Sequence, residues 1–222
     1  EGGGGASARR VAFVGVSKAD DRATQMSGDH LVEPLSHNIE KRFGDRWQVD
    51  VSLRDEATKA RLLDLLGGQD RPSLLFAACH GVEFPKDDPQ GRQERYQGAL
   101  LCQDWAGPES GKGEVPRQAY LAGEDLSPNL DLRGLVAFFF ACYGAGTPRF
   151  DEYTQQAFRD NREVITDRPF VAALPKAMLG LPRGALAVIG HVERAWGTSY
   201  LGERQSTQIA VFESAVERML KG

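Results

Sequence analysis

The sequence lacks the features that mark several common classes of protein. Its longest uninterrupted apolar run, residues 135–142, is far shorter than the roughly 20 residues needed to cross a bilayer, which argues against a membrane span. Three cysteines, Cys79, Cys102 and Cys142, form no C-x-x-C pair, so neither a disulfide framework nor a zinc site is indicated. We therefore expect a protein of the reducing cytoplasm that holds no metal.

An excess of positive charge and a phosphate-binding loop are also missing. The chain carries 27 Lys and Arg against 31 Asp and Glu, a formal net charge of -4, and its basic residues are scattered, which argues against a nucleic-acid partner. No G-x-G-x-x-G follows the first predicted strand, and Gly111-Lys112-Gly113 has neither the spacing nor the preceding strand of a Walker loop. A nucleotide-binding α/β domain is therefore disfavoured.

What remains is the composition of an ordinary globular domain. Hydrophobic residues make up 41% and charged residues 26% of the 222 residues, close to the averages for such domains, and a chain of this length buries a core without cross-links. Residues 1–8 are rich in glycine and have the composition of a flexible linker. We expect one domain over residues 9–222, and residues 1–8 as either a linker within a longer chain or a remnant of cloning.

Apolar runs alternate with amphipathic segments along the chain. Continuous or alternating apolar runs predict strands over residues 10–16, 47–53, 73–80, 135–142 and 185–190. Apolar residues at helical spacing predict helices over residues 31–43, 56–66, 152–158, 170–179 and 205–220. Residues 17–28 are polar and are predicted to form a surface loop. This alternation predicts an α/β fold, with a mostly parallel central sheet flanked by helices.

A long insert separates the third predicted strand from the fourth. Residues 82–131 are rich in proline, glycine and charge, which is typical of loops. Within them, residues 97–102 are predicted to be one strand of an inserted hairpin, and residues 121–128 lead into a short helix or turn.

Two of the apolar runs end in a reactive side chain followed closely by glycine. The first ends at His80-Gly81 and the second at Cys142-Tyr143-Gly144. In open α/β sheets the ligand crevice lies beyond the carboxyl ends of the strands, so these two side chains can converge there. An imidazole activates a neighbouring thiol as a nucleophile, and the Gly81 and Cys142 N–H groups can donate to an oxyanion. The pattern predicts a Cys-His dyad, which needs no cofactor.

The other thiols and imidazoles are weaker candidates. Free cysteines are usually buried and inert, and Cys79 is assigned to the core because successive side chains of a strand face opposite sides. Cys102 has no evident partner. His191 follows the fifth predicted strand, a position from which it could also face the crevice and compete with His80. No glycine follows it, and we predict an exposed polar role for it.

These motifs resemble those of the caspase-like cysteine peptidases of clan CD, most closely their CHAT domains, which are related to separases and gingipains. The similarity spans residues 11–196 and is carried by residues 78–81, 140–144, 172–179 and 184–190. It implies a three-layer α/β fold with a strand pair inserted after His-Gly. It also implies His80 as dyad histidine, Cys142 as nucleophile and the Gly81 N–H as oxyanion donor, for acyl transfer to the thiolate followed by hydrolysis.

The resemblance further implies a biological setting. Such domains are regulated parts of larger proteins, here expected in bacterial defence or signalling, that cleave a protein target, in some cases a pore-forming one. Phe140 stands where the caspase signature has glutamine, so a preference for aspartate is not carried over. Because many CHAT-like chains have lost activity, an inactive scaffold that binds a protein partner is the alternative.

Acidic residues near the expected crevice predict which peptide substrates the enzyme prefers. In this clan the primary pocket commonly draws on the loop after the first strand, which here contains Asp20 and Asp21. A carboxylate in the pocket would pair with Arg or Lys beside the scissile bond. Glu83 and Glu193 are further candidates for substrate binding. A solvated loop of mixed charge is the other reading of the Asp20-Asp21 segment.

Overall fold

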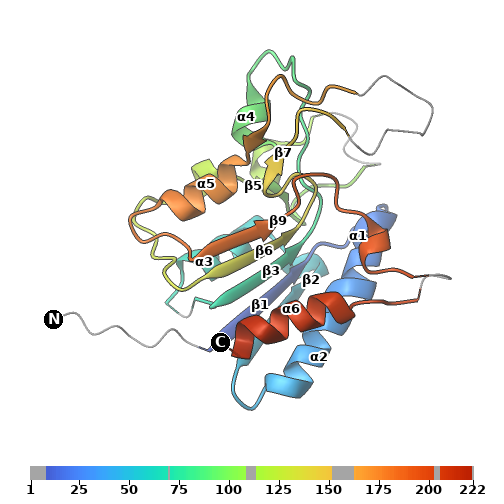
Figure 1. The fold of residues 1–222 in the computed structure, drawn as a ribbon, viewed down its shortest axis with the longest axis vertical. Helices are drawn as coiled ribbons and strands as arrows, with labels where there is room; N and C mark the ends of the chain where they lie inside the picture. The colour runs from blue at the N-terminus through green and yellow to red at the C-terminus, as the bar shows by residue number, and fades with distance from the viewer. Residues whose placement is uncertain (1–8, 70, 109–113, 152–162, 203–205, 222) are drawn as a thin grey trace.

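A parallel β-sheet forms the centre of the molecule (Figure 1). The structure, a computed structural model, describes residues 9–69, 71–108, 114–151, 163–202 and 206–221. Within them the central sheet has five strands, all parallel, in the order β2 (Gln48–Leu53), β1 (Arg10–Gly15), β3 (Leu74–Ala78), β6 (Val136–Phe140) and β9 (Ala187–Gly190). The predicted α/β class with a parallel sheet is confirmed.

Burial explains why the central strands are continuous apolar runs. Every residue of β3 is buried, as a strand covered on both faces requires. The β2 strand lies at the edge of the sheet and alternates in sequence, and most of its residues are exposed or half-buried. The third and fourth apolar runs of the chain therefore form neighbouring strands near the middle of the sheet.

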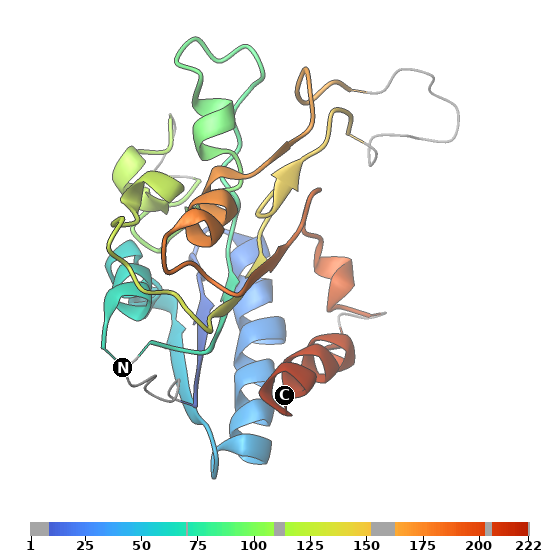
Figure 2. The same ribbon diagram turned by 60° about the vertical axis from the view of Figure 1, so that its left-hand side comes forward.

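Helices cover both faces of the sheet, which gives three layers. On one face α2 (Glu33–Phe43) and α6 (Ala210–Lys221) lie beside each other (Figure 2) and share an apolar core with β1 and β3. On the other face α3 (Lys59–Gly67) and α5 (Ala173–Gly180) pack in a second core. In the described part of the chain, no helix has the length and apolarity that a membrane span requires.

The segment after β1 differs from its prediction. Residues 17–28 were expected to form a surface loop, but α1 (Arg22–Ser27) begins there, with Asp21 as N-cap. Its chain continues through a π-helical turn (Gly28–Val32) into α2. A carboxylate that accepts a backbone N–H at the N-cap stabilises a helix start, and this local interaction outweighs the lack of an apolar stripe.

Helix boundaries shift elsewhere for similar local reasons. Helix α3 begins at Lys59, after Thr58, whose hydroxyl accepts the Arg61 N–H at 3.1 Å. Phe170 and Val171 form β8 (Phe170–Val171) against β7 (Gly146–Thr147), so the helix predicted from residue 170 begins later, at α5. The predicted linker over residues 1–8 and helix over residues 152–158 lie outside the described residues.

The insert forms a small unit beyond the carboxyl ends of the central strands (Figure 1). The predicted hairpin is confirmed: β4 (Leu100–Leu101) pairs antiparallel with β5 (Tyr120–Leu121). Together with α4 (Arg92–Tyr96), the hairpin encloses an apolar cluster of its own. Gly81 forms an isolated antiparallel bridge to Leu100, so the insert is anchored next to the residue that follows His80.

Candidate active site

The register of β3 and β6 brings His80 and Cys142 together. Ala78 is paired with Phe140 at the last ladder position, and each reactive residue lies two positions further along its own strand. The contact continues past the ladder, because a Cβ on Gly81 would lie 1.8 Å from the Cys142 carbonyl oxygen. Both side chains line one pocket of about 320 Å³. The two residues that the sequence predicts as a dyad therefore share a crevice.

Cys142 occupies a tight turn that is held from two sides. The Gly144 N–H donates to the Ala141 carbonyl at 3.1 Å, and Tyr143 has a φ of 57°, a left-handed conformation that costs a non-glycine residue roughly 1–2 kcal/mol. The Tyr143 side chain is fully buried. The backbone N–H of Tyr143 donates to the Glu193 carbonyl at 2.9 Å. Packing thus compensates the strain in this turn.

The insert supports the turn from the other side. Gly98 has a φ of 74°, and a Cβ there would lie 2.0 Å from the Tyr143 carbonyl oxygen. Only glycine combines the left-handed backbone with so close an approach. The insert therefore helps to position the residue that presents Cys142.

The surroundings of the Cys142 sulfur favour the thiol over the thiolate. Burial raises its pKa, and the Glu83 carboxylate acts in the same direction, against the Ala195 N–H and the Arg194 charge. That N–H donates to Sγ at 3.3 Å. Because a thiol is a weak nucleophile, reaction at Cys142 needs a base that removes its proton.

His80 is oriented by Asp21. The His80 Nε2 and an Asp21 carboxylate oxygen are 2.6 Å apart, and the other carboxylate oxygen accepts the Ala23 N–H at 3.1 Å as helix N-cap. Burial favours protonation of Asp21, but the hydrogen bond and charge of His80, with the helix donors, hold its pKa below the ordinary value. An ionised Asp21 accepts the Nε2–H, so the lone pair of the neutral imidazole is on Nδ1.

The base and the thiol are not hydrogen-bonded to each other in this structure. Among the described residues, no hydrogen bond joins the His80 ring to the Cys142 sulfur. Catalytic contacts of this kind often tighten only when substrate is bound. Nδ1 is the ring nitrogen left to act, since Asp21 occupies Nε2.

The acidic residues predicted to bind substrate lie in different places. Asp20 is half-buried and lines a separate surface pocket around α1, while the Asp21 carboxylate is engaged by His80. Glu83 is exposed, and Glu193 lies behind the Cys142 turn, with its carbonyl on Tyr143. Of these four residues, none lines the pocket that contains Cys142. The structure thus gives Asp21 a contact other than substrate binding.

The prediction for Cys79 is confirmed, and the prediction for His191 is wrong. Cys79 packs against the core as expected, and it also lines the pocket. His191, predicted to be exposed and polar, is half-buried, with its ring edge-on to Phe140 at 4.9 Å. Burial lowers the pKa of His191.

Several residues that line the pocket were not predicted from the sequence. Arg194 lines the pocket and pairs with Asp151, which is fully buried. Trp196 and Tyr200 come from the irregular segment after β9. Ion pairs between positions so far apart leave no periodic signal in sequence, and an irregular segment has no period at all.

Fold and crevice together define an α/β protein that presents a thiol, an imidazole and a carboxylate at the carboxyl ends of a parallel sheet. Neither a family model, nor a curated protein, nor a solved structure matches this chain. Over the described residues there is no cluster of three or more His, Cys, Asp or Glu side chains arranged to hold a metal ion. The similarity to caspase-like peptidases therefore stays a prediction.

Proposed function

We propose that the chain is a caspase-like cysteine peptidase domain, in which Cys142 is the nucleophile, His80 the general base and Asp21 a residue that positions His80. The observation that carries the proposal is the shared pocket of Cys142 and His80, with Asp21 on the Nε2 of the imidazole. A nucleophile, a base and a group that orients the base form the recurring arrangement of covalent acyl transfer.

The reaction follows from these positions. His80 Nδ1 takes the proton from Cys142 Sγ, and the thiolate attacks the carbonyl carbon of the scissile peptide bond. His80 then gives the proton to the leaving amine, which departs and leaves a thioester on Cys142. A water molecule, deprotonated by His80, attacks the thioester, and the carboxylic acid and the thiol are released.

The oxyanion of each tetrahedral intermediate needs hydrogen-bond donors. The N–H groups of Gly81 and Cys142 meet this need, because within the described structure neither donates to a backbone carbonyl. Gly81 lies directly against the Cys142 backbone, so both donors belong to the same small region. Removing one such donor typically costs about 10²-fold to 10³-fold in kcat.

Asp21 supports the base in two ways. Its charge stabilises the imidazolium that forms when His80 takes the thiol proton, and its hydrogen bond selects the neutral tautomer that carries its proton on Nε2 and its lone pair on Nδ1. Because Asp21 also caps α1, the carboxylate is held in place before substrate arrives. The low pKa of Asp21 keeps this arrangement intact at neutral pH.

The resemblance supports a protein as the target and a regulated role in bacterial defence or signalling. The three cysteines are free thiols, which agrees with a reducing compartment such as the cytoplasm. The inactive scaffold remains the alternative, and a peptide-cleavage assay separates the two.

The test is hydrolysis of a panel of internally quenched peptides. We expect cleavage by the unaltered protein, loss of cleavage in Cys142→Ala, and cleavage at nearly the original rate in Cys102→Ala, which removes a buried thiol outside the pocket. Cleavage that survives in Cys142→Ala would exclude Cys142 as the nucleophile. A folded protein that cleaves no peptide and whose Cys142 reacts with no peptidyl electrophile would support the scaffold.

A further inference from the structure

The pocket that contains Cys142 is lined mainly by apolar side chains. They come from α1, from the end of β6 and from the segment after β9: Ala23, Met26, Phe140, Ala195, Trp196 and Tyr200. The volume of about 320 Å³ is at the lower end of the range of ligand pockets, roughly 300–1,000 Å³. The pocket therefore has the size for one large side chain.

Two buried aromatic rings, those of Phe140 and Tyr200, form part of the pocket wall. Phe140 and Tyr200 are 4% and 3% exposed, and their rings meet edge to face at 5.5 Å. Phe140 packs in the same manner against Phe212, at 5.8 Å. Burial raises the pKa of Tyr200 to about 12, in keeping with apolar surroundings. Trp196, 38% exposed, provides an accessible indole at the pocket.

The charges in the pocket are already paired. His80 holds Asp21, and Arg194 holds the fully buried Asp151. Asp151 already neutralises the Arg194 charge, so an acidic substrate side chain would bring a second carboxylate next to a buried one, and like charges that close repel each other.

A basic substrate side chain meets no carboxylate in the pocket lining. Among the described residues that line the pocket, none carries one, and Glu83, whose charge acts on Cys142, is exposed outside it. The hydroxyls of Thr24 and Ser27, which also line it, donate to the backbone carbonyls of Asp21 and Thr24. Transfer of an unpaired charge into such surroundings is unfavourable.

We propose that this pocket selects a large apolar residue, such as Leu, Met or Phe, on the acyl side of the scissile bond. The inference rests on the proposed peptidase function and replaces the preference for Arg or Lys predicted from Asp20 and Asp21. Because Cys142 itself lines the pocket, the side chain that fills it belongs to the residue whose carbonyl is attacked.

The first test compares peptides that differ only at that residue. We expect kcat/KM at least about tenfold higher for Leu, Met or Phe than for Arg, Lys or Asp, the size of discrimination that an apolar pocket achieves. Equal or faster cleavage after a charged residue would overturn the inference.

A second test changes the pocket wall. Met26→Glu places a carboxylate on α1 at the pocket, and we expect it to raise cleavage after Arg or Lys relative to Leu at least tenfold, on the order expected for a charge-assisted contact. Val211→Glu is the matched control, because Val211 is 76% exposed on α6 and lies outside the pocket. It should leave the preference unchanged.

Trp196→Ala provides an independent variant should Met26→Glu fail to fold. It should lower cleavage after Phe or Leu, while cleavage after Ala stays nearly constant. Unchanged preferences in a folded Trp196→Ala variant would overturn the inference. Cleavage that depends on Cys142 but favours charged residues would refute the pocket assignment and leave the peptidase function standing, whereas absence of all cleavage and of Cys142 labelling would remove both.

Discussion

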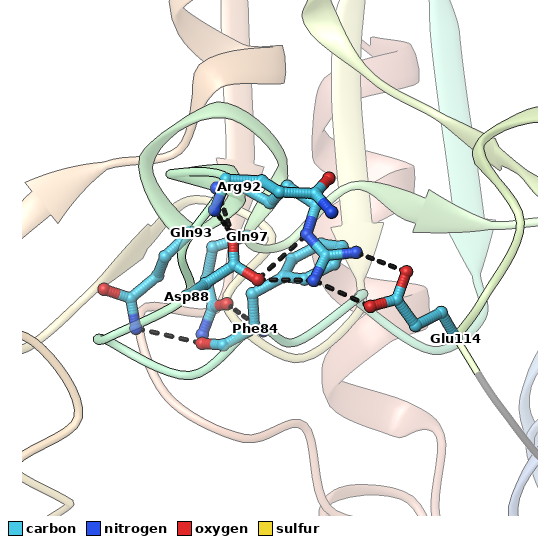
Figure 3. A network of polar contacts seen from close by, with 7 residues as sticks. Phe84, Asp88, Arg92, Gln93, Gln97 and Glu114 are labelled. Atoms are coloured by element: carbon cyan, nitrogen blue, oxygen red, sulfur yellow. Dashed lines mark hydrogen bonds and ion pairs between the residues drawn. The ribbon is translucent and has the colours of Figure 1, made fainter.

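Two polar clusters in this protein contain the same kinds of side chain but differ in how completely those side chains are hydrogen-bonded. One lies in the insert around Asp88 (Figure 3), and the other lies in the crevice around His80. In the insert, each hydrogen-bonding group of the central carboxylate is occupied. In the crevice, donors and acceptors are left open beside a thiol.

In the insert cluster, both oxygens of the Asp88 carboxylate accept hydrogen bonds. One Asp88 oxygen accepts from the Arg92 guanidinium and the other accepts the N–H groups of Gln90 and Arg92. Arg92 also binds Glu114, at 2.7 Å, and the Gln93 amide donates to the carbonyls of Phe84 and Ile165. The full hydrogen bonding of the Asp88 carboxylate fixes the path of the loop. In the same cluster the buried Gln97 Nε2 has no hydrogen-bond partner among the described residues.

The crevice is arranged differently. His80 has one ring nitrogen in a hydrogen bond, the N–H groups of Gly81 and Cys142 donate to no backbone carbonyl in the described structure, and Tyr143 keeps a left-handed backbone. Unused donors and a strained turn are costly for stability and are found mainly where function requires them. The comparison separates a cluster that builds the fold from one suited to chemistry.

Removing the charge of Asp21 should have the largest effect. Asp21→Asn keeps an N-cap residue but no longer favours the tautomer with Nδ1 free, so we expect kcat/KM to fall by about 10²-fold to 10⁴-fold. The measurement is peptide hydrolysis, with the ¹⁵N shifts of the His80 ring reporting the tautomer. A rate within threefold of the original, with an unchanged tautomer, would exclude a positioning role.

Crowding the crevice should come next. Gly81→Ala places a Cβ 1.8 Å from the Cys142 carbonyl oxygen, so the turn must shift; we expect loss of most activity and about 1–3 kcal/mol of destabilisation. Gly180→Ala is the matched control, because a Cβ there meets nothing within 4 Å. Urea unfolding and hydrolysis rates check both. Equal behaviour of the two variants would mean that Gly81 does not pack against the turn.

Breaking the insert cluster should have the smallest effect, and one confined to stability. The Arg92 hydrogen bonds hold the pKa of Asp88 at about 2, below its ordinary 3.8. A carboxylate with a lowered pKa stabilises the fold above the ordinary value and loses this effect as pH falls through the lower one. Asp88→Asn should therefore lower the unfolding midpoint by a few degrees at neutral pH and flatten its decline between about pH 4 and pH 2.

Thermal unfolding as a function of pH measures this effect. Hydrolysis at neutral pH and moderate temperature should stay close to the original rate. A large loss of activity in a folded Asp88→Asn variant would show that the two clusters are coupled.

Sequence patterns were informative where burial decides the structure. The runs that form β3 and β6 are apolar throughout because both faces of the sheet are covered. Since the two strands are parallel, their positions in the sequence were enough to predict that His80 and Cys142 converge. The hairpin at Leu100 was visible for a similar reason, since its strands enclose an apolar cluster.

Sequence patterns did not predict the structure where contacts between residues far apart in the sequence determine it. Helix α1 is short and polar, and the residue that caps it is bonded to His80, 59 positions away. The pairing of Arg194 with Asp151 spans 43 positions. An Asp that precedes a helix start is a signal that could have been read at position 21, but its partner is set by the packing of α1 against the crevice.

The most direct measurement is the identity of the thiol that a peptidyl electrophile labels. The protein is treated with a leucine-terminated acyloxymethyl ketone and digested, and the adduct is located by mass spectrometry. If Cys142 is the nucleophile and His80 its base, the adduct forms on Cys142 and is strongly reduced in His80→Ala. Labelling of Cys79 or Cys102 instead, or labelling of Cys142 that is equally fast without His80, would contradict the account.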